Sequence, residues 1–383
     1  MEKDKITIAF FLPSLEPGGT ERNVVNLVNY IDKKRYAVSL VLGTAEGNFL
    51  KEINNDIPII NLHTRRSTTT FFKLVAYFKK TQPDIFISAF PRINVICIAA
   101  KIFSKAKTKI IITEHSVFSF LPIISKTFWR GMFARFFMPS LCNWLYPKAD
   151  AIICVSKGIA DDIIKTVSRA LKVTVIYNPV IVSNIYQLAQ EPIDHSWFSA
   201  DSNSKIPVIT AVGRLVTCKD YPTLFKALKL VLKRQLCRLV ILGEGPQKEA
   251  LMQLADRMGI SQNVAFLDFQ QNPFRYMARG SVFVLASLQE GFGNVIIEAM
   301  ACGASVVSTD CPVGPGEIIE NMKNGILVPV GDEKSMASAI FKVLNDPVLA
   351  EQLSTAGRER AKFFSVAKNV GEYEKVFDEL SHD

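Results

Sequence analysis

The chain has 383 residues, 49% of them hydrophobic and 21% charged, which is a globular composition too long for one compact core. Its seven cysteines form no CxxC pair and its four histidines are dispersed, which argues against a disulfide framework and a zinc knuckle. No apolar stretch is long and unbroken enough to predict a membrane span, and the acidic residues and Pro13 near the N-terminus argue against a signal peptide.

Short aliphatic and β-branched runs alternate with helical stretches through the first half of the chain. Helices are predicted at 20–31 and 71–81. Nearly continuous apolar strands separated by helices indicate a parallel sheet that is covered on both faces. The predicted strands are 6–12, 37–42, 57–62, 84–90, 109–113, 151–156 and 173–177.

The alternation lapses after Val180 and then restarts, which predicts two domains. The second set of strands is predicted at 207–215, 238–243, 263–269, 281–287, 304–310 and 325–330. The chain is therefore predicted to be an α/β protein of two Rossmann-like domains. Their predicted bounds are 1–190 and 205–362, with a linker at 191–204 and a C-terminal helical segment at 363–383.

The net charge of +9 lies entirely in the first half of the chain. Between Arg65 and Lys148 there are 14 basic and two acidic residues, interleaved with aromatic stretches at 71–80 and 118–146. Such a segment fits solvated helix faces, a nucleic-acid surface or an anionic membrane surface. If it binds a membrane, charge reversal should release the protein from anionic vesicles when made at Lys79, Lys80, Arg130 and Arg135.

Ligands of open α/β sheets bind beyond the carboxyl ends of the strands, so glycines and charges that follow strands are candidate site residues. Gly18 and Gly19 follow the first predicted strand and open a helix, where backbone N–H groups can approach an anion. The pattern is neither GxGxxG nor a P-loop, so it predicts neither a dinucleotide site nor a nucleoside-triphosphate site.

Two cations follow the first strand of the second domain. Arg214 comes directly after Gly213 at the strand end, and Lys219 follows five residues later. Cations at this edge can hold a diphosphate and offset the charge that develops on a leaving group. Two ordinary surface cations remain the alternative interpretation.

The most specific pattern is EGFGNVIIEAMACG at 290–303. Glu290 lies in a glycine-containing loop after a strand, and Glu298 lies in the following helix among apolar residues, where a carboxylate normally needs a partner. The loop amides and the helix dipole favour a negative group at the helix start. A carboxylate one turn into the helix can accept hydrogen bonds from a ribose diol.

Three weaker candidates follow other strands. Glu244 in GEGP either caps the next helix or contacts a ligand. His115 in ITEHS lies at a strand end, where a structural role and a functional role are equally open. Glu317 lies in a second Gly/Pro loop, interpreted first as loop structure.

Taken in order, these motifs resemble the retaining family-four glycosyltransferases of the two-domain GT-B fold. The resemblance extends over nearly the whole chain, and the two glutamates separated by seven residues are its most specific part. It implies two parallel sheets that face each other across a cleft, with the last helix returning to the N-terminal domain. It also implies a retaining reaction that needs no metal and no other cofactor.

The resemblance implies a role for each candidate. Arg214 and Lys219 would contact the donor diphosphate, Glu298 the ribose and Glu290 the donor sugar. His115 would face the transferred sugar. The remaining donor-binding candidates are Gly18, Gly19, Glu244, Gly291, Phe292, Gly293 and Asn294.

The sequence departs from the family pattern at three places. Asp220 stands where a glycine usually follows the lysine, Ala286 where a proline is usual, and Asp268 where a glycine is usual. The third departure affects the expected nucleobase contact. In the family pattern a glycine lets the backbone approach the base, and here the backbone would have to approach it with the Asp268 side chain present.

The predicted function is transfer of a hexose or N-acetylhexosamine from a UDP-sugar, or less favourably a GDP-sugar, to a lipid-linked saccharide in bacterial surface-polysaccharide assembly. The N-terminal domain would bind the acceptor and an anionic membrane surface, with no nucleic-acid partner. The protein would be cytoplasmic and peripheral on the inner face of the cell membrane. The alternatives are a sugar-nucleotide epimerase of the same architecture and a nucleic-acid-binding protein that uses the basic 65–148 segment.

Overall fold

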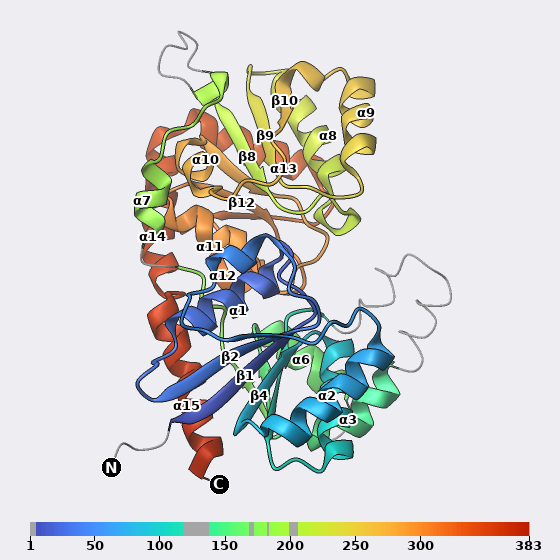
Figure 1. Cartoon of the computed structure of the whole chain (residues 1–383). Coiled ribbons are helices and arrows are strands. Elements are labelled where there is room, and N and C mark those ends of the chain that lie inside the picture. The colour runs from blue at the N-terminus through green and yellow to red at the C-terminus, as the bar shows by residue number, and fades with distance from the viewer. Residues whose placement is uncertain (1–4, 118–137, 168–171, 182–183, 199–205, 383) are drawn as a thin grey trace. The chain divides into compact units, whose positions relative to one another are not determined.

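The computed structural model of the chain describes residues 5–117, 138–167, 172–181, 184–198 and 206–382. The chain divides into two compact units, one formed by Met1–Pro179 with Val366–Asp383 and the other by Val180–Ser365 (Figure 1). The division falls at Pro179, earlier than the predicted end of the first domain at residue 190.

The first unit contains a seven-stranded parallel sheet in the order β3-β2-β1-β4-β5-β6-β7. All seven predicted strands are present, and the prediction for 6–12 is confirmed residue for residue. The strand order reverses between β1 and β4, the kind of position where α/β sheets bind ligands. The strands are β1 (Ile6–Leu12), β2 (Tyr36–Leu42), β3 (Ile59–Asn61), β4 (Ile85–Ala89), β5 (Lys109–Glu114), β6 (Ala151–Cys154) and β7 (Val173–Val175).

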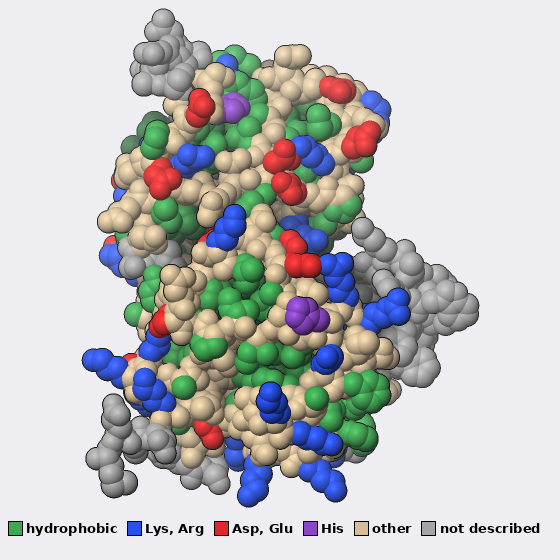
Figure 2. Space-filling model, viewed as in Figure 1, with side chains coloured by type: hydrophobic (Ala, Val, Ile, Leu, Met, Phe, Trp, Pro, Cys, Tyr) green, Lys and Arg blue, Asp and Glu red, His purple; other side chains and the backbone are tan. Residues whose placement is uncertain are grey.

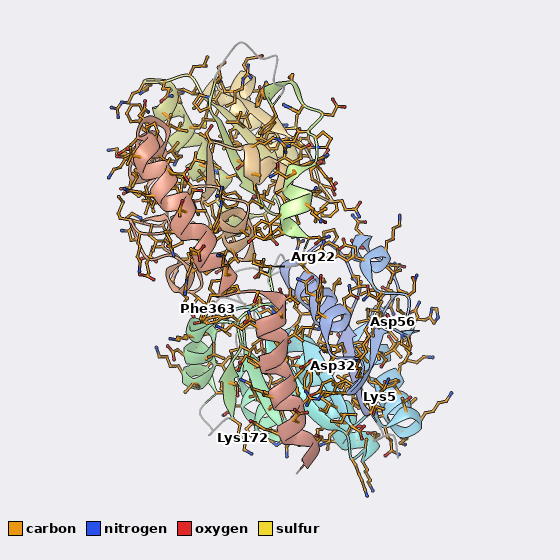
Figure 3. All side chains as sticks on the ribbon, turned by 90° about the vertical axis from the view of Figure 1, so that its left-hand side faces the viewer. Lys5, Arg22, Asp32, Asp56, Lys172 and Phe363 are labelled. Atoms are coloured by element: carbon orange, nitrogen blue, oxygen red, sulfur yellow. The ribbon has the colours of Figure 1, made fainter. Side chains whose placement is uncertain are left out.

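Helices cover this sheet, and α15 closes it from a distant part of the chain. In Figures 1 and 3, α15 lies beside α1. Its Glu374 accepts a hydrogen bond from the backbone N–H of Asp32 at 2.9 Å, and Asp378 accepts one from the Tyr36 hydroxyl at 2.7 Å. The helices are α1 (Gly19–Tyr30), α2 (Ser67–Thr81), α3 (Pro91–Ser104), α6 (Lys157–Thr166) and α15 (Val366–His382).

The second unit contains a six-stranded parallel sheet in the order β10-β9-β8-β11-β12-β13. Its order reverses between β8 and β11. Because both units carry parallel sheets with helices between the strands, the predicted class of two Rossmann-like domains is confirmed. The strands are β8 (Val208–Val212), β9 (Arg238–Leu242), β10 (Val264–Phe266), β11 (Val282–Leu285), β12 (Val306–Thr309) and β13 (Ile326–Val328).

The helices of the second unit include one that the sequence did not predict, α7, in the segment where alternation lapses. Three side-chain donors hold the carbonyls near its end: Asn272 contacts the carbonyl of Leu188 at 2.8 Å, and Arg279 contacts those of Ala189 and Gln190 at 3.2 and 2.9 Å. These tertiary contacts place α7 in the second unit. The helices are α7 (Ile185–Gln190), α8 (Tyr221–Leu232), α9 (Lys248–Met258), α10 (Phe274–Arg279), α11 (Asn294–Ala301), α12 (Pro315–Ile318), α13 (Glu333–Asn345) and α14 (Pro347–Lys362).

The described residues form neither a membrane-spanning helix nor a cluster of metal ligands. Within those ranges, none of the helices combines the length and hydrophobicity that crossing a membrane would require. In the same part of the chain, no three His, Cys, Asp or Glu side chains gather as a metal site would require. All seven cysteines are free thiols.

Candidate active site

The loops after β8 and β9 lie against each other at the carboxyl edge of the second sheet. The backbone N–H of Leu215 donates to the carbonyl of Glu244 at 2.8 Å. A Cβ atom at Gly243 would lie 2.1 Å from the carbonyl oxygen of Gly213, so only glycine permits this approach. The packing places the exposed side chains of Arg214 and Glu244 on neighbouring turns at one edge.

Lys219 and Glu290 form an ion pair where the strand order reverses. Lys219 follows β8, Glu290 follows β11, and the ammonium Nζ lies 2.5 Å from the carboxylate Oε1. The Ser287 hydroxyl donates to the same oxygen at 2.7 Å. The backbone N–H of Leu288 donates to the carbonyl of Cys218 at 2.8 Å, which ties the two loops together.

The pair is well shielded from solvent, with side-chain exposures of 19% for Lys219 and 11% for Glu290. Burial lowers the pKa of Lys219. The charge of Glu290 and its hydrogen bond raise this pKa by more than burial lowers it, so the pKa lies above the usual range for lysine. Lys219 therefore stays an ammonium at physiological pH. A fixed positive charge at this edge can stabilise a diphosphate.

The glycine loop before α11 presents its backbone and hides its aromatic ring. Gly293 has φ of 102° and forms the N-cap of α11, as the sequence predicted for a helix that begins near Asn294. The Phe292 side chain is buried at 2% exposure, so a nucleotide sugar could contact this residue only through its backbone. Glu298 is half-buried, one turn into α11.

Two departures from the family pattern have a common backbone explanation. Asp220 and Asp268 both occupy the left-handed region, with φ of 43° and 50°. Aspartate is among the few non-glycine residues that adopt this conformation readily. The turns that glycine usually makes are therefore kept, and the Asp268 carboxylate is paired with Lys248.

His115 lies at the end of β5 in the first unit, above a tightly bonded polar cluster. Its Nε2 lies 3.0 Å from the Thr113 hydroxyl, and partial burial lowers its pKa to about 3, so the imidazole is neutral at physiological pH. Asn94 donates from its amide to the Glu114 carboxylate at 2.7 Å and to the Thr113 carbonyl at 3.1 Å. The Tyr146 hydroxyl also donates to Glu114. These bonds fix the backbone that carries His115.

Gly18 and Gly19 lie at the N-terminus of α1, after β1, as predicted. Gly18 is the N-cap and has extended backbone. Its carbonyl accepts from the backbone N–H of Arg22 at 3.0 Å. Arg22 in turn pairs with Glu52 and lies over the Phe49 ring at 4.0 Å, so this cation is held beside the helix start.

The structure thus gathers the predicted residues in two groups, one in each unit. The second unit brings together the turns that carry Arg214, Lys219, Glu244 and Glu290. In the first unit, a small pocket is lined by His115, by Val24 and Leu27 of α1, and by Tyr373 of α15, among others.

Sequence reasoning missed several residues that hold the candidates in place. Ser287, three residues before Glu290 at a strand end, was visible as a possible partner. Glu114 was visible too, since a carboxylate in an apolar strand needs partners. Asn94 gave no signal, because its bonds join segments distant in sequence. The predicted helix-capping role of Glu244 is wrong: α9 begins at Lys248, and the Glu244 carboxylate instead accepts from the backbone N–H of Phe269 at 3.4 Å.

Comparisons with known proteins identify the family of this chain. Residues 17–184 match the family model described as Glycosyltransferase Family 4, and residues 206–346 match the model described as Glycosyl transferases group 1. The chain therefore belongs to the family-four glycosyltransferases.

Two relatives are similar to this chain over nearly its whole length. The chain is 32% identical over 376 residues to the N-acetylgalactosamine-N,N'-diacetylbacillosaminyl-diphospho-undecaprenol 4-alpha-N-acetylgalactosaminyltransferase of Campylobacter jejuni, covering 94% of this chain and 96% of that enzyme. A second Campylobacter jejuni enzyme, a GalNAc-alpha-(1->4)-GalNAc-alpha-(1->3)-diNAcBac-PP-undecaprenol alpha-1,4-N-acetyl-D-galactosaminyltransferase, is 28% identical, covering 98% of this chain and 99% of that enzyme.

A solved structure confirms the GT-B fold. The Anabaena protein HepE, in complex with UDP and glucose, superposes with a TM-score of 0.81 at 21% identity, covering 97% of this chain and 99% of that chain.

Proposed function

We propose that this glycosyltransferase moves a hexose or N-acetylhexosamine from a UDP-linked donor to a lipid-linked saccharide, with retention of configuration, in the assembly of a bacterial surface polysaccharide. The observation that carries the proposal is the shielded pair of Lys219 and Glu290 at the position where the second sheet reverses its order. The two Campylobacter relatives, named as enzymes of undecaprenol-linked substrates, support the acceptor class.

The residues divide the chemical work as follows. The bond between the anomeric carbon and the diphosphate oxygen breaks, and the acceptor oxygen forms its new bond on the same face of the sugar. The proton of the acceptor hydroxyl passes to the departing diphosphate oxygen. Lys219 and Arg214 stabilise the departing diphosphate, Glu290 orients the sugar hydroxyls and Glu298 binds the ribose. Neutral His115 acts as a hydrogen-bonding partner of the sugar and not as a charge.

The reaction is proposed to run without a metal or another cofactor, because ammonium and guanidinium groups and backbone amides supply the positive field that a metal would give. An activity assay in excess EDTA tests this point. Loss of transfer in EDTA, with recovery on adding a divalent cation, would count against it.

Replacing Glu298 with alanine is expected to abolish the stabilisation that the donor nucleotide gives to the protein. A ligand bound only by the folded state raises the melting temperature, so UDP, GDP and ADP are compared by thermal shift on wild type and on Glu298→Ala. UDP should raise the melting temperature of wild type and have at most a small effect on the variant.

The matched control is Glu249→Ala, which changes an exposed glutamate in the first turn of α9. It should respond to UDP as wild type does. If no nucleotide shifts wild type, the proposed donor class is wrong. If UDP-sugar is consumed without acceptor and yields an epimerised UDP-sugar, the epimerase alternative gains the support.

The first unit has a surface that fits a membrane. Figure 2 shows hydrophobic side chains beside basic ones on the right-hand side of this unit, over α2 and α3. Phe72 and Phe103 are 67% and 66% exposed, and each packs its ring against Phe71. Exposed lysines flank them at positions 73, 79, 80, 105 and 107. Exposed aromatic rings with surrounding cations are typical of proteins that bind anionic lipid. We propose that this face holds the enzyme peripherally on the membrane that carries its acceptor.

Reversing the charge of Lys79 and Lys80 is expected to weaken binding to anionic vesicles by at least about tenfold, because each basic residue near such a surface contributes about 1 kcal/mol. Sedimentation with phosphatidylglycerol vesicles measures the effect. Arg130 and Arg135, the other two residues predicted from sequence, lie outside the described residues. Reversal of the exposed Lys229 and Lys233 in the second unit is the control, and an equal loss in both variants would contradict the assignment of this face.

A further inference from the structure

The two places where the chain passes between the units are joined by hydrogen bonds. The chain crosses at Pro179–Val180 and again at Ser365–Val366. The backbone N–H groups of Val180 and Ile181 both donate to the carbonyl of Phe364 at 3.1 Å. Ile181 and Ser365 form a parallel bridge. The Phe364 carbonyl thus binds the first two residues of the second unit.

The side chain of Phe364 reaches the glycine loop. It is fully buried, and its ring centroid lies 5.5 Å from that of Phe292 in an edge-on arrangement at 71°. Phe292 is the buried aromatic residue of the loop between Glu290 and α11. One residue therefore bonds the crossing segment through its carbonyl and supports the loop through its ring.

Arg360 holds Phe364 and the neighbouring loop together. Its guanidinium lies 5.0 Å from the centre of the Phe364 ring. It also donates to the carbonyls of Glu317 at 2.7 Å and Ile318 at 3.1 Å, at the end of α12. The ring of Phe363, a residue labelled in Figure 3, lies 5.2 Å from the same guanidinium.

The loop that precedes α12 contacts the backbone of the glycine loop. A Cβ atom at Gly314 would lie 2.3 Å from the Phe292 carbonyl oxygen, so the two loops are in direct backbone contact. Phe292 therefore contacts Gly314 through its backbone and Phe364 through its ring. A shift of Phe364 would move the backbone amides of the loop.

We propose that Phe364, braced by Arg360, is a positioning residue for the Gly291–Asn294 loop and that it couples occupancy of this loop to the crossing segment at Val180 and Ile181. The inference rests on the proposed role of the loop in donor binding. Tight aromatic packing passes a displacement on to its neighbours, because interiors are close-packed. Donor bound to the loop should then stabilise the crossing segment, and loss of the ring should weaken donor binding.

The experiment compares Phe364→Leu with Phe225→Leu, which removes an equally buried ring from α8, where it packs on Phe266 at a centroid distance of 6.3 Å. Both variants lose core packing in the same unit. Only Phe364→Leu should raise the Kd for UDP and the KM for the donor, by about tenfold or more, with a smaller change in kcat. An equal effect in both variants would overturn the proposal, since it would reflect general destabilisation.

A second variant covers the case in which Phe364→Leu does not fold. Arg360→Lys keeps the positive charge but loses the planar fork that contacts two carbonyls. It should weaken UDP binding in the same direction, by about threefold or more. Unchanged UDP binding in a folded Arg360→Lys variant would contradict the proposal that Arg360 holds Phe364 in place.

Hydrogen exchange separates the coupling from the proposed function itself. In wild type, UDP should slow exchange at the amides of Val180 and Ile181 as well as at the loop, and in Phe364→Leu saturating UDP should slow it at the loop alone. If UDP protects the loop of wild type but not the two crossing amides, the donor site stands and the coupling is wrong. If UDP neither shifts the melting temperature nor slows exchange anywhere, the proposed function and this inference both fail.

Discussion

Replacing Lys219 with alanine is expected to destabilise the second unit and to lower the transfer rate at least about a hundredfold. The Glu290 carboxylate, 11% exposed, would lose its ammonium partner and, among the residues that the structure describes, keep the Ser287 hydroxyl. Removing one member of a shielded pair leaves an uncompensated charge, here at a cost of roughly 2–3 kcal/mol because some solvent contact remains. The loss of rate follows from removing a cation that stabilises the leaving group. Urea unfolding and initial rates measure the two effects.

A double variant separates stability from catalysis. Lys219→Met combined with Glu290→Gln removes both charges, so most of the lost unfolding free energy should return while transfer stays lost. The control is Lys248→Ala, whose pair with Asp268 is more exposed, at 36% and 50%, and should change the unfolding free energy by less than about 1 kcal/mol. Wild-type transfer by Lys219→Ala would remove this residue from the proposed mechanism.

Replacing Glu114 with glutamine is expected to flatten the pH dependence of stability between about pH 4.5 and pH 7. Burial raises the pKa of Glu114 to about 7, although the hydrogen bonds from Tyr146 and Asn94 act in the opposite direction. The unfolded chain has a pKa near 4.5 at this residue. Between these values the folded state binds more protons than the unfolded state, so the stability of wild type falls as the pH rises. Above about pH 7 this group adds no further change.

The size of the effect follows from the displacement of the pKa, which corresponds to roughly 3 kcal/mol across the window. Chemical unfolding at pH 4.5, 6 and 7.5 on wild type and Glu114→Gln measures it. The quantity compared is the slope of the unfolding free energy against pH, because the new amide also alters local hydrogen bonds and so shifts the free energy itself. Glu52→Gln, at the half-buried pair with Arg22, is the control. Parallel curves for wild type and Glu114→Gln would show that Glu114 does not set the dependence.

Local patterns predicted much of this fold because the periodicity of parallel α/β units is strong. The first strand, 6–12, and the start of α11 at Asn294 were predicted correctly, since each is bounded by proline or glycine. The helix α7 was missed because its six residues are stabilised by side chains of Asn272 and Arg279, which lie more than 80 positions away. Contacts of that range have no local signature.

The candidate site was predictable in its residues but not in its pairings. Gly/Glu motifs after strands pointed to Arg214, Lys219, Glu290 and Glu298. The structure places the first three in the segments that follow β8 and β11, and Glu298 one turn into α11. That Lys219 bonds Glu290 depends on the reversal of strand order between β8 and β11. Likewise, the EGFG motif did not reveal that the Phe292 ring faces Phe364 and is removed from solvent.

The return of α15 to the first unit affects how the chain folds while the ribosome makes it. Its Val370, Tyr373 and Phe377 are buried in that unit, yet the ribosome makes them only after the entire second unit. The first unit therefore cannot complete its core when its own strands emerge, and the surface that α15 covers stays open during translation. Domains that fold as they are synthesised usually finish in chain order. Here the second unit can finish first, and the nascent first unit has an apolar surface that chaperones can bind.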